Sequence, residues 1–306
     1  MKFVNLVKMS ILTLFMAISS TGNSENMFSL LPTPTSGWSS IPAPELPPGK
    51  TPATIELEDG NFVALIGKVD ENSVSGVLER VSASKSKHMY LFISSPGGNI
   101  VAGAQLIAAL HGSGKHFTCI ADFAASMAFV ILQSPPCTER LVMSSSITMQ
   151  HQAAYGIEGK DANNQSMMKF IQSMISSHDT FQAKRLGLTL EQFKNRTHDD
   201  WWLWGLNSIT EGVADREALV KCTGNLASQH ETLEFTGFMG MKFSVEVNKC
   251  PLITKIYSVK PIKPFLSLSM SSQDTNDKVL AEFLAARNPR ELLKTGKFDT
   301  SFDMTP

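Results

Sequence analysis

The sequence predicts an α/β protein in which helices flank a mainly parallel sheet, followed by a small C-terminal α+β extension. The first observation is that strand-like and helix-like segments alternate from about residue 53 onward. Parallel strands need crossover connections, usually helices, so this alternation favours a parallel sheet. The second observation is composition: 42% of the 306 residues are hydrophobic and 18% are charged, as expected for a chain that buries a core.

The strands and helices are expected to alternate along the chain. Strands are predicted at 61–69, 89–95, 116–122 and 140–151, and helices at 71–82, 103–111, 127–133, 165–184 and 190–194. Beyond residue 222 the chain has three strand-like pieces, TLEF, MKFSVEV and TKIYSV, and a helix-like run over 278–294 that is broken near Pro289. We interpret residues 223–306 as an added lobe or an oligomerisation arm without identifiable chemistry.

The N-terminal 22 residues are predicted to be a secretory signal peptide. Lys2 and Lys8 precede an apolar stretch at about 11–18, and small and polar residues follow it. A membrane anchor is the alternative, but it needs about 20 apolar residues. The mature chain is therefore expected to be periplasmic or secreted. Residues 23–52 are dense in proline and serine, which predicts an extended arm.

Charge and motifs exclude several classes of function. The formal net charge is −1 and no block of like charges occurs, so neither nucleic acid nor an anionic membrane is expected as a partner. The chain has no HExxH motif, no phosphate loop and no dinucleotide fingerprint. No cofactor and no metal are therefore expected.

Polar residues in three separate segments supply the parts of a nucleophilic site. Ser126, in AASMA, lies on a strand-to-helix turn, where a serine acts either as a nucleophile or as a helix N-cap. His151 follows a strand, and Asp199 and Asp200 precede a tryptophan cluster. Together they offer a nucleophile, a base and a carboxylate that orients the base. The tryptophans themselves fit core packing or a substrate wall.

A glycine pair adds a further element of such a site. Gly97 and Gly98 follow a buried strand in SSPGGNIVAG, so backbone N–H groups can point into a cleft with no Cβ in the way. An oxyanion is stabilised by such donors. Taken alone, Pro-Gly-Gly is also an ordinary turn.

Four segments resemble the Clp protease proteolytic subunit family in order and spacing: LFISSPGGNIVAGAQLIAAL, TCIADFAASMAFVIL, MQHQAAYGIEG and LGLTLEQFKNRTHDDWWLWGLNSITEGVAD. The resemblance covers about residues 53–222 and implies a crotonase-type fold with a protease domain there. It implies Ser126 as nucleophile, His151 as general base and Asp200 as orienting carboxylate. Gly98 and Met127 would donate the oxyanion N–H groups.

Several positions depart from the family pattern. Ala128 stands where glycine is usual, and Ala153 stands where proline is usual. The glycine-rich strand after the histidine is reduced to GIEGKDANN, which puts ring-to-ring stacking in doubt. The resemblance implies a peptide or unfolded-protein substrate and a homo-oligomer. Export makes an ATP-driven unfoldase partner unexpected.

The four cysteines are expected to form disulfides if the chain is exported. Four cysteines allow three connectivities. A strand-helix-loop hairpin can return Cys137 to Cys119, and Cys222 with Cys250 would then join the main domain to the C-terminal extension. Four buried thiols remain the alternative.

The resulting functional prediction is an exported serine endopeptidase that works through an acyl-enzyme on Ser126, without an ATPase partner. A peptidase similar to signal peptide peptidase A, with a Ser-Lys dyad, is the first alternative, although no lysine is placed near Ser126 by motif. A non-catalytic scaffold or binding protein on the same fold is the second. Acyl-CoA chemistry on this fold ranks last, because export removes its substrate.

Overall fold

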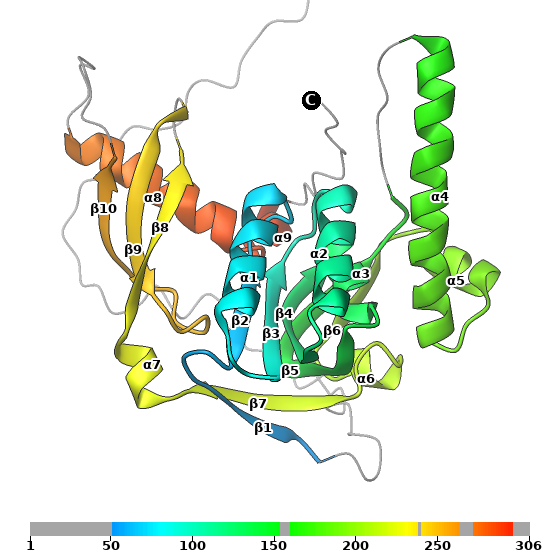
Figure 1. Ribbon diagram of the computed structural model, residues 1–306, viewed down its shortest axis with the longest axis horizontal. Coiled ribbons are helices and arrows are strands. Elements are labelled where there is room, and N and C mark those ends of the chain that lie inside the picture. Colours follow the sequence, from blue (N-terminus) through cyan, green and yellow to red (C-terminus); the bar gives the residue numbers. More distant parts are fainter. Residues whose placement is uncertain (1–50, 154–159, 238–239, 263–271, 296–306) are drawn as a thin grey trace, which may run out of the picture. The chain divides into compact units, whose positions relative to one another are not determined.

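The computed structural model describes residues 51–153, 160–237, 240–262 and 272–295 (Figure 1). The predicted signal peptide and nearly all of the predicted arm lie outside these ranges. Within them, every helix is too short or too polar to cross a membrane.

Within the described residues, the main sheet has seven strands in the order β1-β7-β5-β4-β3-β2, with β6 paired to β5. The strands are β1 (Ala53–Leu57), β2 (Phe62–Ile66), β3 (His88–Ser95), β4 (His116–Ala125), β5 (Cys137–Gln150), β6 (Trp201–Trp204) and β7 (Arg216–Cys222). Every pair is parallel except β5 with β6. The predicted fold class is therefore confirmed.

One face of this sheet is covered by helices (Figure 1). The helices of the domain are α1 (Glu71–Ala83), α2 (Ile100–Gly112), α3 (Met127–Gln133), α4 (Asp161–Arg185), α5 (Leu190–Arg196) and α6 (Asn207–Thr210). Side chains of α1, α2 and α3 form one core with the inward-facing residues of β2, β3 and β4, and all of α3 is buried. Helix α2 begins three residues before its predicted start, because the Asn99 side chain accepts a hydrogen bond from Ala102 N and caps it.

The opposite face of the sheet carries a second core, which includes residues of β1 and β7. Phe92, Ile120 and Leu141 of the sheet form this core with side chains of these two strands. One disulfide lies within the domain, and a second joins it to the C-terminal lobe. Cys119 is bonded to Cys137 and Cys222 to Cys250, with Cα–Cα distances of 5.4 and 6.1 Å. These are the two pairings that the sequence favoured.

The C-terminal lobe, residues 224–237, 240–262 and 272–295, has its own sheet and core. It contains α7 (Gly224–Ser228), β8 (His230–Thr236), β9 (Lys242–Asn248), β10 (Ile256–Pro261), α8 (Ser272–Arg287) and α9 (Glu291–Thr295). The strands form an antiparallel sheet in the order β10-β9-β8. Phe243, Val245 and Val247 of β9 pack against Val279 and Phe283 of α8. The helix-like run predicted over 278–294 is thus two helices, interrupted near Pro289, because proline cannot continue a helix.

Ion pairs and one close backbone approach join the lobe to the main domain. Arg80 of α1 pairs with Glu231 of β8 at 2.5 Å, and Lys249 pairs with Asp59 at 2.7 Å. Gly67, which follows β2, has a φ of +83°, and a Cβ there would lie 2.6 Å from the carbonyl oxygen of Ala286 in α8. Only glycine therefore allows α8 to approach this closely.

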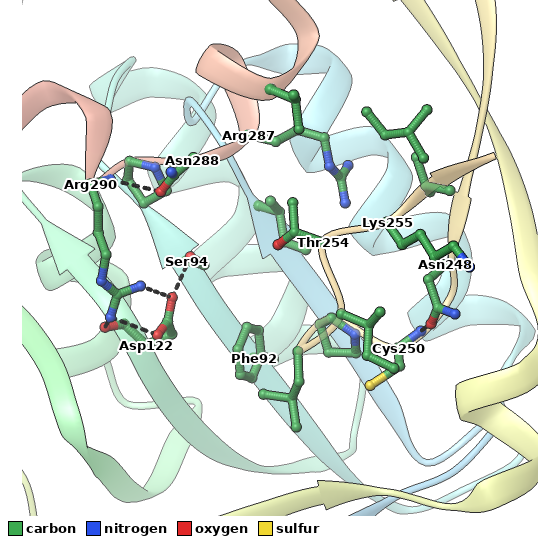
Figure 2. Close-up of a pocket in the computed structure, with 18 of the residues that line it drawn as sticks. Phe92, Ser94, Asp122, Asn248, Cys250, Thr254, Lys255, Arg287, Asn288 and Arg290 are labelled. Atoms are coloured by element: carbon green, nitrogen blue, oxygen red, sulfur yellow. Dashed lines mark hydrogen bonds and ion pairs between the residues drawn. The ribbon is translucent and has the colours of Figure 1, made fainter. Parts of the chain in front are cut away.

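Arg290 makes the most extensive of these contacts. Its Nη1 and Nη2 donate to the two carboxylate oxygens of Asp122 at 2.8 Å, and Nη2 also donates to the carbonyl of Ser145 at 3.1 Å. Ser94 Oγ donates to the same Asp122 carboxylate at 2.7 Å. Figure 2 shows this network at one wall of a cavity of about 320 Å³ between the lobe and the sheet. Three distant segments of the chain therefore meet at Asp122.

Candidate active site

Ser126 lies between β4 and α3 in an unusual backbone conformation. Its φ is 53° and its ψ is −121°, and among the described residues no other non-glycine has a positive φ. Its N–H donates to Met149 O of β5 at 2.9 Å, and its carbonyl accepts from Val130 N at 3.1 Å. Ser126 occupies the N-cap position of α3, but its hydroxyl makes no capping bond to the helix. Such a backbone costs about 1–3 kcal/mol and is kept where surrounding contacts fix it.

His151 directly follows β5 and contacts the serine. The β4–β5 pairing places Ala125 opposite Met149, which brings the ends of both strands together. His151 Nε2 lies 2.9 Å from Ser126 Oγ. Burial lowers the pKa of His151 from its ordinary 6.5, and the charge of Asp200 partly opposes this. A neutral imidazole, able to accept a proton, is therefore favoured near pH 7.

A buried pair of amides supports the His151 segment. His151 N–H donates to the side-chain carbonyl of Gln150 at 3.1 Å, and the Gln150 amide donates to Gln182 of α4 at 2.6 Å. Both glutamines are buried. Gln152 N–H donates to Thr197 O at 3.1 Å, which ties the histidine segment to the segment that carries Asp200.

The two aspartates differ in their relation to the imidazole. Asp200 is exposed, and its charge acts on His151, but within the described ranges no hydrogen bond joins the two side chains. The side chain of Asp199 is 98% exposed and lies 3.2 Å from the neighbouring His198. Of the two, Asp200 therefore influences the site, and it does so through charge.

The glycine loop borders the serine turn. Gly97 has a φ of +93°, and a Cβ there would lie 2.7 Å from Ser126 Cβ and 2.8 Å from Met127 N. Gly98 has a φ of +146°, and its neighbours on both sides bond to Val69: Val69 N donates to Gly97 O and Asn99 N donates to Val69 O, each at 2.8 Å. In the described part of the chain, neither Gly98 N–H nor Met127 N–H has an acceptor. Both donors are therefore unpaired among the described residues, and Gly98 and Met127 line the same cavity as Ser126.

These groups open into a cavity of about 950 Å³. Its walls include Gly97, Gly98, Ser126, Met127 and His151 from the main domain. The C-terminal lobe supplies further walls: Leu233–Thr236 of β8, Lys242 of β9, and Phe283 and Ala285–Arg287 of α8. Sequence reasoning assigned no chemistry to the lobe and missed this contribution, because no local motif marks residues that meet the site only through the fold.

Other candidate arrangements find less support. Lys68 and Lys242 line the cavity, but the described hydrogen bond of Ser126 Oγ is to His151 and none goes to a lysine. In the same ranges, no cluster of three His, Cys, Asp or Glu side chains is suited to a metal ion.

Two of the three clustered tryptophans, Trp201 and Trp202, pack against core residues. Trp201 lies against Phe129 of α3, with ring centroids 6.1 Å apart, and the Arg196 guanidinium lies 5.0 Å from its ring centre. Trp202 packs against a small core at the ends of β4 and β5. Trp204 is 57% exposed and contributes to neither core.

The fold and the site together define a class of protein. A serine on a strained strand-to-helix turn, a histidine within hydrogen-bond distance and two free backbone donors form the arrangement of serine hydrolases. Comparison with known proteins narrows the class. Residues 56–221, more than half of the chain, match the Clp protease family, and the chain belongs to that family.

Individual relatives are similar at low identity. The chain is 28% identical over 128 residues to ATP-dependent Clp protease proteolytic subunit 2 of Tropheryma whipplei, which covers 42% of this chain and 71% of the relative. It is 26% identical over 159 residues to ATP-dependent Clp protease proteolytic subunit 3 of Rhodococcus jostii, and the match covers 50% of this chain and 79% of the relative. A Streptococcus pyogenes proteolytic subunit is 22% identical over 161 residues, covering 50% and 82%. The resemblance stated from the motifs is therefore confirmed, and it ends where the lobe begins.

Proposed function

We propose that this chain is a serine endopeptidase. Ser126 Oγ attacks the carbonyl carbon of a peptide bond while His151 Nε2 takes its proton, and the Gly98 and Met127 N–H groups stabilise the oxyanion. The imidazolium then gives the proton to the leaving amine, which departs and leaves an acyl-enzyme. Water, activated by the same imidazole, releases the acyl product and restores Ser126.

The observation that carries this proposal is the 2.9 Å contact between Ser126 Oγ and His151 Nε2, made by a serine whose φ is positive although it is not a glycine. Asp200 has the role of stabilising the imidazolium by its charge, which agrees with its opposing effect on the pKa of His151. Hydrogen bonds of a catalytic site often tighten only when substrate is bound, so the proposal keeps Asp200 as the carboxylate that orients His151.

The proposal includes export and independence from an ATPase. Support for export comes from the signal-like pattern at residues 1–22 and from two disulfides, which persist in oxidising compartments. An ATP-driven partner is not expected there. The proposed substrates are peptides or unfolded chains.

A homo-oligomer is also proposed. Helix α4 exposes Met167, Met168 and Phe170, which are 41%, 42% and 55% accessible. Exposed apolar side chains gathered on one element favour a protein contact.

The direct test is labelling of the folded mature protein with a fluorophosphonate probe. We expect labelling of the wild type, complete loss in Ser126→Ala, and strong loss in His151→Ala. Ser228→Ala, which alters an exposed serine of the lobe, is the matched control and should label normally. Persistent labelling of Ser126→Ala would reject the nucleophile. A folded wild type that neither labels nor cleaves peptides would favour the non-catalytic scaffold, and labelling that survives His151→Ala but needs Lys68 or Lys242 would favour the Ser-Lys dyad.

A further inference from the structure

The outer edge of β8 carries backbone groups that have no hydrogen-bond partner among the described residues. Strand β8 ends the order β10-β9-β8 and is therefore an edge strand (Figure 1). Thr236 lies opposite Lys242, so Gly237 lies opposite Met241, and Gly237 N–H donates to Met241 O at 2.9 Å. In an antiparallel ladder, bonded and non-bonded pairs alternate. Phe235 is therefore bonded to β9, whereas Thr236 and Glu234 direct their N–H and C=O groups away from it.

Two hydrogen bonds on the side of β9 that faces β10 agree with this alternation of bonded and non-bonded pairs. Lys242 O accepts from Ile262 N at 2.9 Å, and Asn248 N donates to Lys255 O at 3.0 Å, so both residues of β9 point toward β10. Their partners on β8 are Thr236 and His230. Thr232, Glu234 and Thr236 thus share one outward direction, and in the described part of the chain none of their backbone groups has a hydrogen-bond partner.

This free edge borders the cavity that contains Ser126. Four consecutive residues, Leu233–Thr236, line the cavity. Successive side chains of a strand point to opposite faces, so a single face would contribute only alternate residues. Consecutive lining means that the edge of the strand borders the cavity. Thr232 lies on the same edge but outside the cavity lining.

Strand β8 is fixed in place by the core of the lobe and by an ion pair to the main domain. Leu233 and Phe235 pack into the core of the lobe, and the Phe235 ring lies 5.3 Å from that of Phe283 on α8. The ion pair between Glu231 and Arg80 fixes the start of β8 to α1. An edge that is rigid before binding loses little conformational entropy when it is extended by another strand.

We propose that the edge of β8 binds the substrate peptide as an added antiparallel strand beside Ser126. This inference rests on the proposed endopeptidase function and assigns the C-terminal lobe to substrate binding. Glu234 and Thr236 each offer one donor and one acceptor, at the two-residue repeat of an extended peptide. Main-chain bonds of this kind depend little on side chains, so the edge selects extended, unfolded segments and tolerates many sequences.

Proline substitutions test the edge without disturbing the sheet. Glu234→Pro and Thr236→Pro each remove an N–H that points away from β9, so no ladder bond is lost. Thr232→Pro makes the same change on the same edge outside the cavity and is the matched control. Each variant is compared with the wild type for hydrolysis of a ten-residue fluorogenic peptide and for the rate of fluorophosphonate labelling.

We expect Glu234→Pro and Thr236→Pro each to lower kcat/KM for the peptide about three- to tenfold, because each variant loses one backbone hydrogen bond. Labelling by the small probe should stay within about twofold of the wild type, as should peptide hydrolysis by Thr232→Pro. Wild-type kcat/KM in both cavity-edge variants would overturn the inference, while normal labelling in them would leave the proposed function intact. A wild type that does not label would instead refute the proposed function.

A second measurement uses the unaltered protein. Singly N-methylated analogues of the same peptide lose one backbone donor each. Added-strand binding predicts that hydrolysis falls at alternate positions on one side of the cut, whereas a uniform effect contradicts it. A second copy of the chain, paired edge to edge through β8, is the competing occupant of this edge. If Glu234→Pro dissociates a dimer, measured by light scattering, and leaves peptide hydrolysis unchanged, β8 is a self-association surface and the inference is wrong.

Discussion

At the scale of single residues, the backbone conformation of Ser126 depends both on the local sequence and on contacts with residues distant in the chain. The AASMA segment predicts a strand-to-helix turn, but the positive φ of Ser126 is held by its bond to Met149 and by the absence of a side chain on Gly97. Sequence motifs identified Ser126, His151 and the glycine loop as a set, and the structure brings them together. The motifs also predicted that Asp200 orients the histidine, whereas the structure shows a charge effect without a direct bond.

The lowered pKa of His151 has a measurable consequence. His151 must be neutral to take the serine proton, so the labelling rate should be constant at neutral pH and fall as the pH drops through the His151 pKa. Because burial lowers that pKa, we expect the midpoint below pH 6.5. The measurement is the fluorophosphonate labelling rate between pH 4 and 8, within the range in which the protein stays folded by circular dichroism.

Replacing Asp200 should move this midpoint further. Asp200→Asn removes the charge that raises the His151 pKa, so the midpoint should shift to lower pH, and the plateau rate should fall roughly 10²-fold as imidazolium stabilisation is lost. Asp199→Asn is the matched control, since that side chain is 98% exposed and should change neither quantity. Equal effects of the two substitutions would contradict the assignment of Asp200.

At the scale of elements, Asp122 links the strands that carry the site. The registers of β3 with β4 and of β4 with β5 both shift beside Asp122, so the residue lies in an irregularity four positions before Ser126. Ser94, close to the glycine loop, and Arg290, from the lobe, bond to its carboxylate. The Arg290 contact spans 168 positions of sequence, and no motif signals a pairing of that kind.

Loss of this contact should weaken the fold. We expect Arg290→Ala to lower the free energy of unfolding by about 1–3 kcal/mol, because the mostly buried Asp122 carboxylate loses its charged donors. Arg290→Lys keeps the charge but not the paired geometry and should give an intermediate value. Urea unfolding measures both. Lys294→Ala removes an exposed pair with Glu291 in α9 and should cost about 0–1 kcal/mol. An Arg290→Ala effect no larger than this control would show that the network is not stabilising.

At the scale of the whole molecule, the sequence predicted the domain that has a family pattern far better than the lobe that has none. The alternation of strands and helices and the glycine, serine and histidine motifs sufficed for the α/β fold, because each depends on short-range periodicity or spacing. The three strand-like pieces after residue 222 also form strands, yet their placement beside the cavity depends on Gly67, Arg80 and Asp122 in the other domain. Contacts of that kind are properties of the folded chain.

The Cys222–Cys250 disulfide should matter most for the lobe. The bond closes a loop with a sequence separation of 28, so its removal in the double variant Cys222→Ala, Cys250→Ala is expected to cost about 3–4 kcal/mol. Hydrogen exchange should rise in β8–β10, while β4 and β5 stay protected. The double variant Cys119→Ala, Cys137→Ala is the comparison, since that bond lies within the main sheet and its loss should raise exchange there. Equal protection of the lobe with and without Cys222–Cys250 would contradict its tethering role.

The oxidation state of Cys222 and Cys250 also affects how firmly the lobe is placed beside the cavity. In a newly made chain whose two thiols are still reduced, the lobe is held by ion pairs, by packing and by its chain connection to β7, without the disulfide as a second covalent link. Oxidation then adds a second covalent link between the end of β7 and the lobe, which supplies several walls of the cavity. We therefore expect the placement of those walls beside Ser126 to vary more in the reduced chain than in the oxidised chain.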